Sequence, residues 1–98
     1  MAKRTVRWSE RAINDKLMIF SYWIERNQSI AYPMKLENLF DDALETVAIF
    51  PLSGRSTEVE NVRMVIVRNY KLVYRISKEL IEVVTVWDGR RNPSDFKI

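Results

Sequence analysis

The sequence lacks two residue types altogether, cysteine and histidine. Without cysteine the chain has no disulfide framework and no thiolate site, which fits a reducing compartment. A catalytic triad with a serine or cysteine nucleophile is excluded, because it needs residues that are missing here. Metal ligands are also scarce. The adjacent carboxylates Asp41 and Asp42 would point in different directions on a helix, so we expect neither a metal nor an organic cofactor.

Glycine, proline and long apolar runs are few as well. Two glycines, three prolines and 47% hydrophobic residues are the composition of one folded domain of 98 residues, not of a disordered chain. No glycine-rich loop is available to hold a phosphate. No apolar run approaches the roughly 20 residues of a membrane span. The basic start of the chain also lacks the apolar region of a secretory signal. We therefore expect a cytoplasmic protein with no membrane partner.

Charged residues are plentiful but unevenly distributed. Residues 1–27 carry a net charge of +3, residues 28–60 of −4 and residues 61–98 of +4. If the two basic ends meet in the fold, they form a positive surface that attracts polyanions or acidic protein segments. The plainer interpretation is ordinary solvated charge.

Two amphipathic helices follow each other in the first half of the chain. Ser9 is a typical N-cap, and Glu10 places a carboxylate in the first turn, where it suits the helix dipole. A stripe of apolar residues at spacings of four, three and four then marks one helix face: Ile13, Leu17, Phe20 and Ile24. This helix should stop at residues 27–29. A second stripe consists of Leu36, Phe40, Ala43, Val47 and Phe50.

Prolines set the bounds of the second helix. Pro33 fits only a first helical turn, so this helix should begin near Tyr32 or Pro33, and Pro51 should end it. A short linker between the helices predicts an antiparallel helical hairpin.

Strands are predicted at both ends of the chain. A short one covers residues 4–8, and three more cover about 62–68, 70–77 and 80–87 after a polar loop at 51–60. The short junctions between the last three suit antiparallel hairpins. We therefore predict an α+β domain in which an N-terminal strand and a helical hairpin pack on one face of an antiparallel sheet, in the order β-α-α-β-β-β.

Four short motifs in this order resemble a known family. They are Trp8-Ser9-Glu10-Arg11-Ala12, Arg63, Tyr70-Lys71-Leu72-Val73-Tyr74-Arg75 and Trp87-Asp88-Gly89-Arg90-Arg91-Asn92-Pro93. Their order resembles the RelE/ParE superfamily of toxins from bacterial type II toxin–antitoxin systems. The resemblance covers nearly the whole chain and implies a single toxin domain over residues 1–98.

The resemblance also implies a function and partners. Members of the superfamily inhibit growth in toxin–antitoxin systems of the plasmid-stabilisation type, and a cognate antitoxin protein neutralises them. RelE-like members cut mRNA on the ribosome, whereas ParE-like members bind DNA gyrase. We expect one of these targets here, with an acidic and apolar antitoxin segment that covers the cations. A homodimer is also compatible with the sequence.

The motifs name candidate site residues. Positions at which the RNase members carry working cations are occupied by Arg63, Lys71 and Arg91, which we therefore name as catalytic. We expect four further residues to contact the target: Arg68, Arg75, Arg90 and Trp87. All these side chains should converge on one patch.

Proton-transfer groups are harder to assign. Cleavage at a 2′-hydroxyl needs a general base and a general acid as well as cations. The superfamily's RNases often place Tyr or His near the C-terminus, where this chain has Phe96. Asp88, Glu60, Tyr70 or Tyr74 are the conceivable replacements. Whether the chain is an enzyme, a ribosome-dependent endoribonuclease, is therefore left open, with a slight preference for the gyrase branch.

A different class of function is compatible with the same residues. A non-toxic RNA- or protein-binding module derived from the same fold would also lack the acid and base. Tyr70, Tyr74 and Trp87 could stack on bases, but aromatic residues in strands more often pack in the core. Growth inhibition distinguishes a toxin from such a module.

Overall fold

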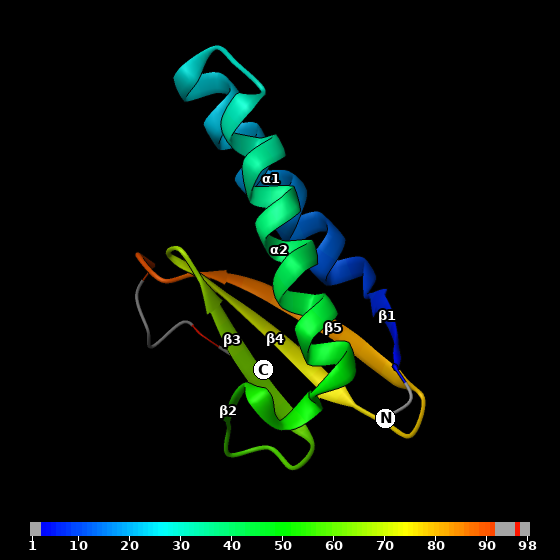
Figure 1. The fold of residues 1–98 in the computed structure, drawn as a ribbon. Helices are drawn as coiled ribbons and strands as arrows, with labels where there is room; N and C mark the ends of the chain where they lie inside the picture. Colours follow the sequence, from blue (N-terminus) through cyan, green and yellow to red (C-terminus); the bar gives the residue numbers. More distant parts are fainter. Residues whose placement is uncertain (1–2, 92–95, 97–98) are drawn as a thin grey trace.

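The computed structural model describes residues 3–91 and Phe96. The elements in chain order are β1 (Thr5–Trp8), α1 (Glu10–Asn27), α2 (Ala31–Ile49), the 3-10 helix η1 (Pro51–Ser53), β2 (Arg55–Ser56), β3 (Val62–Val67), β4 (Tyr70–Ile76) and β5 (Leu80–Asp88). The predicted order of one strand, two helices and three strands is confirmed. The additional strand β2 is a two-residue pairing within the predicted polar loop. Both helices lie on one face of the sheet, and their hairpin extends beyond it (Figure 1).

The sheet is mixed: strands β2 to β5 are antiparallel, as predicted, and the N-terminal strand lies at the edge of the sheet, where the prediction had packed it on one face. Its strand order is β1-β5-β4-β3-β2, and β1 runs parallel to β5. The helical hairpin explains this direction. The end of α2 returns to the start of β1, where the Arg4 N–H donates to the Ala48 carbonyl at 2.9 Å. The chain thus enters β3 in the direction of β1, and two tight hairpins then give β5 the same direction.

Local signals set the helix bounds. The Ser9 hydroxyl accepts a hydrogen bond from the Ala12 N–H at 3.0 Å, which confirms the predicted N-cap. Helix α1 ends at Gln28, whose φ of 51° is left-handed. Helix α2 starts at Ala31, so Pro33 lies in its first turn, where no intrahelical N–H is lost.

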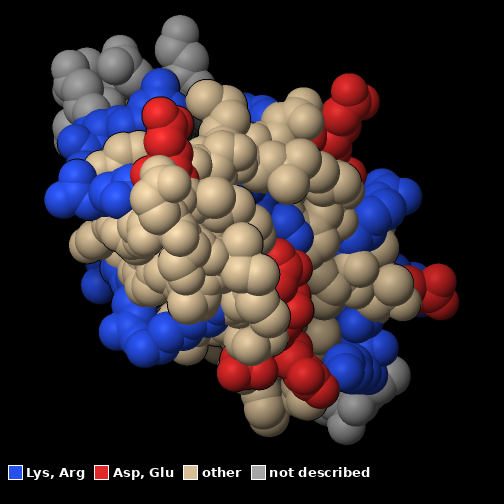
Figure 2. Space-filling view, turned by 90° about the horizontal axis from the view of Figure 1, so that it is seen from above, with Lys and Arg blue, Asp and Glu red and all other residues tan. Residues whose placement is uncertain are grey.

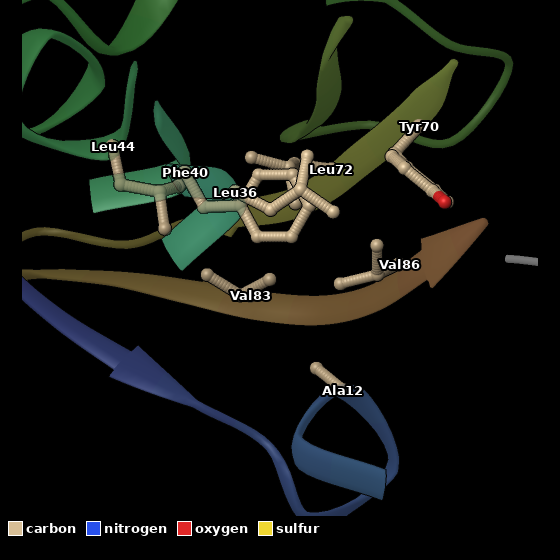
Figure 3. Packing of buried hydrophobic residues seen from close by; sticks show 8 residues of the cluster. All are labelled: Ala12, Leu36, Phe40, Leu44, Tyr70, Leu72, Val83 and Val86. Atoms are coloured by element: carbon tan, nitrogen blue, oxygen red, sulfur yellow. The ribbon is translucent and has the colours of Figure 1, made fainter. Parts of the chain in front are cut away.

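Helix α2 supplies most of the helical side of the core. Its residues Leu36, Phe40 and Leu44 pack on buried residues of the sheet (Figure 3). The sheet residues in this cluster are Tyr70, Leu72, Val83 and Val86. A second cluster of Val47, Tyr74 and Ile81 lies under the end of α2. Phe20 of α1 stacks on Phe40, and α1 therefore covers the core from the side.

Only Phe20 of the predicted apolar stripe of α1 packs on this core. Ala12 is the one fully buried residue of α1, whereas Ile13, Leu17 and Ile24 are 42%, 53% and 40% exposed. The spacing correctly predicts an apolar face, but the neighbouring elements decide which face is covered. Here α1 turns Ala12, Phe20 and Trp23 towards the core, and the other three residues of its stripe are left at the surface.

Candidate functional site

One end of the sheet brings the β3–β4 turn and the end of β5 together. Lys71 pairs with Trp87 across β4 and β5, and the Gly89 N–H donates to the Asn69 carbonyl at 2.6 Å. A Cβ atom on Gly89 would lie only 2.7 Å from that carbonyl oxygen, so the close approach requires glycine. We call this end the basic tip and define it by Arg68, Lys71, Trp87, Arg90 and Arg91.

Cations gather on this side of the molecule. Figure 1 places the end of β5 beside the β3–β4 turn, and Figure 2 shows many Lys and Arg side chains along the same side. Most acidic side chains in that view lie towards the centre and the other side. All cations of the basic tip come from the second basic end, residues 61–98, whereas β1, from the first, pairs with residues 80–83 at the opposite end of β5, so the two basic ends do not form the tip together.

Arg68 occupies the outermost position of the tip. It lies in the two-residue connection between Val67 and Tyr70, is exposed, and has a φ of 58°. Left-handed backbone is costly for a residue with a Cβ atom and is commonly found at functional positions. The turn therefore displays a cation at the end of the sheet.

Lys71, Trp87 and Arg91 form a group with Phe96. Tyr70 and Leu72 face the helices, so Lys71 between them faces away from the helices, as does its partner Trp87. The Trp87 and Phe96 ring centroids lie 5.0 Å apart. The Lys71 Nζ is 5.4 Å from the Phe96 ring and the Arg91 guanidinium carbon is 4.4 Å from the Trp87 ring, as in cation–π contacts.

Arg90 turns to the helix side. Its guanidinium donates to both carboxylate oxygens of Asp88 at 3.1 and 2.9 Å and lies 5.8 Å from the Tyr22 ring and 5.6 Å from the Trp23 ring. Partial burial disfavours the charged form of Asp88, but the hydrogen bonds from Arg90 outweigh it and lower the pKa of Asp88. Arg90 is thus already engaged with the protein.

Arg63 and Arg75 do not join the basic tip. Arg63 pairs with Tyr74 and donates to the carbonyls of Gly54 at 2.8 Å and Leu52 at 3.3 Å. It lies four residues along β3 from Val67, a separation of about 13 Å. Arg75 is still further from the turn. The predicted convergence of Arg63 with Lys71 and Arg91 is therefore not observed.

Arg75 belongs to an ion-pair network across three strands. It contacts Glu82 of β5 at 3.2 Å, and Glu82 also contacts Arg7 of β1 at 3.2 Å. Glu82 is well covered, while both arginine side chains are more than half exposed. This exposed network contributes little to stability and leaves Arg75 paired.

The tyrosines considered for proton transfer are buried. The Tyr70 hydroxyl accepts from the Trp23 indole N–H at 2.7 Å, and the Tyr74 hydroxyl donates to the Pro51 carbonyl at 2.7 Å. Burial is the largest cause that raises the pKa of both hydroxyls above their ordinary 10.0. These side chains are core residues, as the packing interpretation of strand aromatics predicted.

A notch of about 290 Å³ adjoins the basic tip on the helix side. It lies between α1 and the end of β5. Its lining consists of Asp15, Met18, Ile19, Tyr22, Tyr70, Val86, Asp88, Arg90 and Arg91. Sequence reasoning missed it because its walls come from positions 15–22, 70 and 86–91, which are far apart in the sequence.

Two classes of site are not found in the described part of the chain. Residues 3–91 and Phe96 contain no group of three or more His, Cys, Asp or Glu side chains arranged to hold a metal ion. Neither described helix is long and apolar enough to cross a membrane.

Comparisons with known proteins agree with the architecture. The chain is similar over 86% of its length, with a TM-score of 0.71 and 15% identity, to a chain of the chromosomal ParDE toxin–antitoxin system from P. aeruginosa, 94% of which is covered. It is similar over 87% of its length, with a TM-score of 0.64 and 20% identity, to a chain of the toxin–antitoxin complex RelBE2 from Mycobacterium tuberculosis, 96% of which is covered. Identities this low establish the shared fold alone.

The sequence itself gives the family. No curated protein matches the chain significantly. The family model described as the ParE toxin of the type II toxin–antitoxin system parDE matches residues 6–93, which include both helices, most of β1, strands β2 to β5 and the basic tip. The chain therefore belongs to the ParE toxin family of type II toxin–antitoxin systems.

Proposed function

We propose that this protein inhibits bacterial growth by binding DNA gyrase through its basic tip, and that a cognate antitoxin neutralises it. Membership of the ParE toxin family supports a toxin. The observation that favours gyrase over mRNA is the separation of Arg63 from Lys71 and Arg91. Arg63 is bonded to two loop carbonyls about four residues from the β3–β4 turn.

RNA cleavage asks for chemistry that the described residues do not assemble. A base must remove the 2′ proton, cations must stabilise the phosphate, and an acid must protonate the leaving oxygen. The basic tip offers cations, but Asp88 is held by Arg90, and the Tyr70 hydroxyl is buried against Trp23. Phe96, the ring beside Lys71, has no exchangeable proton. Trp87 is only 6% exposed, so the accessible groups of the tip are its cations, which suit binding better than catalysis.

The basic tip is well placed to reach a macromolecule. Arg68 stands on a tight turn, and Arg91 is exposed just beyond the last strand. Arginine and aromatic residues are enriched at protein interfaces, because they combine contact area with several donors. We assign Arg68, Lys71 and Arg91 to the contact with gyrase. Arg90 instead holds the end of β5 against α1 through its contacts with Asp88, Tyr22 and Trp23.

Helix α1 supports an antitoxin partner. Its exposed apolar residues are Ile13, Leu17, Met18, Tyr22 and Ile24, each at least 40% exposed. An exposed apolar surface on one helix commonly marks an interaction site. A segment that folds on binding would cover this surface. The cytoplasm, where both gyrase and ribosomes reside, is the location that this function requires.

Induced expression of the chain in bacteria without an antitoxin tests the proposal. We expect growth arrest with DNA-damage signalling and intact mRNA. Loss of mRNA in ribosome-containing cells would assign the protein to the nuclease branch instead. Normal growth at high levels of the folded protein would favour the non-toxic binding module.

A further inference from the structure

The last strand ends in a tight turn that carries Arg91 to the surface. The Arg91 N–H donates to the Asp88 carbonyl at 3.0 Å, which closes a four-residue turn over residues 88–91. The Asp88 carboxylate also accepts from the Arg90 N–H at 2.9 Å, as an aspartate at the first position of a turn commonly does. Asp88 therefore sets the path of the backbone that leads to Arg91.

The Arg90 side chain fixes this turn to the helices. Its guanidinium contacts both carboxylate oxygens of Asp88, and such a fork sets orientation as well as distance. On its other side it lies 5.6 Å from the Trp23 ring. That ring donates its N–H to the buried Tyr70 hydroxyl and meets the Tyr32 ring edge-on, with centroids 4.8 Å apart. Residues of α1, α2 and β4 thus hold the surface on which Arg90 rests.

The turn at residues 88–91 is also joined to the turn that displays Arg68. The Gly89 N–H donates to the carbonyl of Asn69, the residue that follows Arg68. A shift of residues 88–91 would therefore move Arg91 relative to Arg68. Two cations bind a partner best when their separation is fixed in advance, because less conformational freedom is lost on binding.

Arg90 and Arg91 differ in what they offer to a partner. The Arg90 guanidinium is already bonded to Asp88, whereas Arg91 forms no salt bridge with any described carboxylate. Asp88 lies close enough to Arg91 for their opposite charges to attract. The Asp88 carboxylate thus offsets repulsion between these two neighbouring cations.

We propose that Asp88 and Trp23 are positioning residues for the gyrase contact: acting through Arg90, they hold the turn at residues 88–91 so that Arg91 stands at a fixed place beside the β3–β4 turn. This inference rests on the proposed function, because it takes the basic tip as the surface that meets gyrase. It assigns no gyrase contact to Asp88, Arg90 or Trp23. Breaking the pair should weaken inhibition although the contacting cations remain.

A supercoiling assay with purified DNA gyrase and the full chain tests this role, and the readout is the half-inhibitory concentration. The variants are Asp88→Asn, Arg90→Gln and the double variant. Asparagine keeps an oxygen for the Arg90 N–H, so it preserves the turn while removing the charge. Glu45→Gln is the matched control, because it breaks another exposed ion pair, with Lys3 at 3.0 Å, outside the tip. Thermal unfolding should change little in all four variants, since exposed pairs contribute little to stability.

We expect each single variant of the pair to raise the half-inhibitory concentration about 10-fold, as for a lost charge-assisted hydrogen bond. The double variant should be no weaker than either single variant, because the two residues act as one unit. Arg90→Lys, which keeps the charge without the fork, should restore part of the inhibition. The control should inhibit like the unmodified chain.

A direct contact between Arg90 and gyrase predicts a different pattern. Arg90→Gln would then weaken inhibition, whereas Asp88→Asn would not, and this result would overturn the inference. Native inhibition by both single variants would also overturn it and leave the proposed function intact. Absence of inhibition by the unmodified chain would instead overturn the proposed function on which the inference rests.

NMR relaxation reports the positioning without gyrase. In the unmodified chain, residues 89–91 should be as rigid as β5, and the Arg90 Nε–H, which donates to Asp88 at 3.1 Å, should exchange slowly with water. Asp88→Asn should remove both features. Trp23→Leu should mobilise Arg90 more than Trp23→Phe, which keeps a ring beside the guanidinium. Unchanged order of residues 89–91 in Asp88→Asn would overturn the role of Asp88, and in Trp23→Leu that of Trp23.

Discussion

Asp15 of α1 accepts a hydrogen bond from the backbone N–H of Val86 in β5 at 3.1 Å. Strand β1 ends at Trp8, opposite Val83, so β5 continues past its neighbour with an open edge. The Asp15 carboxylate substitutes there for a strand and also accepts from Thr85. One helix side chain thus protects an edge that could otherwise pair with another chain.

Replacement of Asp15 by alanine should destabilise the fold. The Val86 N–H and the buried Thr85 hydroxyl both lose their acceptor, and an unsatisfied buried polar group costs about 1–3 kcal/mol. Urea unfolding should show this loss, whereas Asn14→Ala, an exposed neighbour, should change stability by less than about 0.5 kcal/mol. Equal stability of the two variants would show that Asp15 has no such role.

Gly89→Ala should disrupt the basic tip. Its Cβ atom would meet the Asn69 carbonyl oxygen at 2.7 Å, a backbone atom that cannot simply rotate away. We expect a loss of about 1–3 kcal/mol, together with changed amide resonances at Asn69 and Lys71. NMR spectra and thermal unfolding measure both effects. An unperturbed Asn69 resonance would contradict the tight junction between the turn and β5.

Alkaline pH should destabilise the protein through its buried tyrosines. Burial raises the pKa of Tyr70 and Tyr74 in the folded state above the ordinary 10.0, so the fold favours their neutral forms. This contribution is fully present below pH 10 and is lost as the pH rises through the raised pKa. Unfolding free energies measured between about pH 8 and pH 11 should fall at the upper end. A flat profile would contradict the burial of both hydroxyls.

Tyr74→Phe should weaken the loop that follows α2. The Tyr74 hydroxyl donates to the Pro51 carbonyl and accepts from the Gly54 N–H, so it joins β4 to both sides of η1. Its loss should cost about 1–3 kcal/mol at neutral pH. The same variant should show a smaller loss of stability above pH 10, because one titrating group is gone. Chemical unfolding at two pH values tests both statements.

The two helices should differ sharply in their response to core substitutions. Leu17→Gln should change stability by less than about 0.5 kcal/mol, because Leu17 is 53% exposed. Phe40→Ala should cost about 3–5 kcal/mol, because Phe40 is fully buried between α1 and the sheet. A large loss from Leu17→Gln would mean that the α1 stripe is covered in the free protein.

This contrast shows what local sequence could predict. Caps, proline positions and apolar spacing gave the order and approximate bounds of the elements, because these signals act within one turn or strand. The spacing of Ile13 and Leu17 could not reveal that their face stays open, since Phe40 and the sheet take up the other side of α1. The direction of β1 likewise depends on the return of α2 to Arg4, a contact across 44 residues.

The candidate site was predictable in part for the same reason. Arg68, Lys71, Trp87, Arg90 and Arg91 flank the tight turn and the end of the last strand, and hairpin pairing brings them together. Arg63 lies in the same motif series but pairs at the other end of β3. The notch between α1 and β5 is lined by residues that are far apart in the sequence, so no spacing along the chain predicts it.

The most direct test of the central claim is a supercoiling assay with purified DNA gyrase, relaxed plasmid and the purified chain. We predict that the protein blocks supercoiling and that reversal of Arg68 and Arg91 to glutamate abolishes the block, whereas Arg55→Glu does not. Unimpaired supercoiling at saturating protein, with cleavage of mRNA on added ribosomes, would contradict the account.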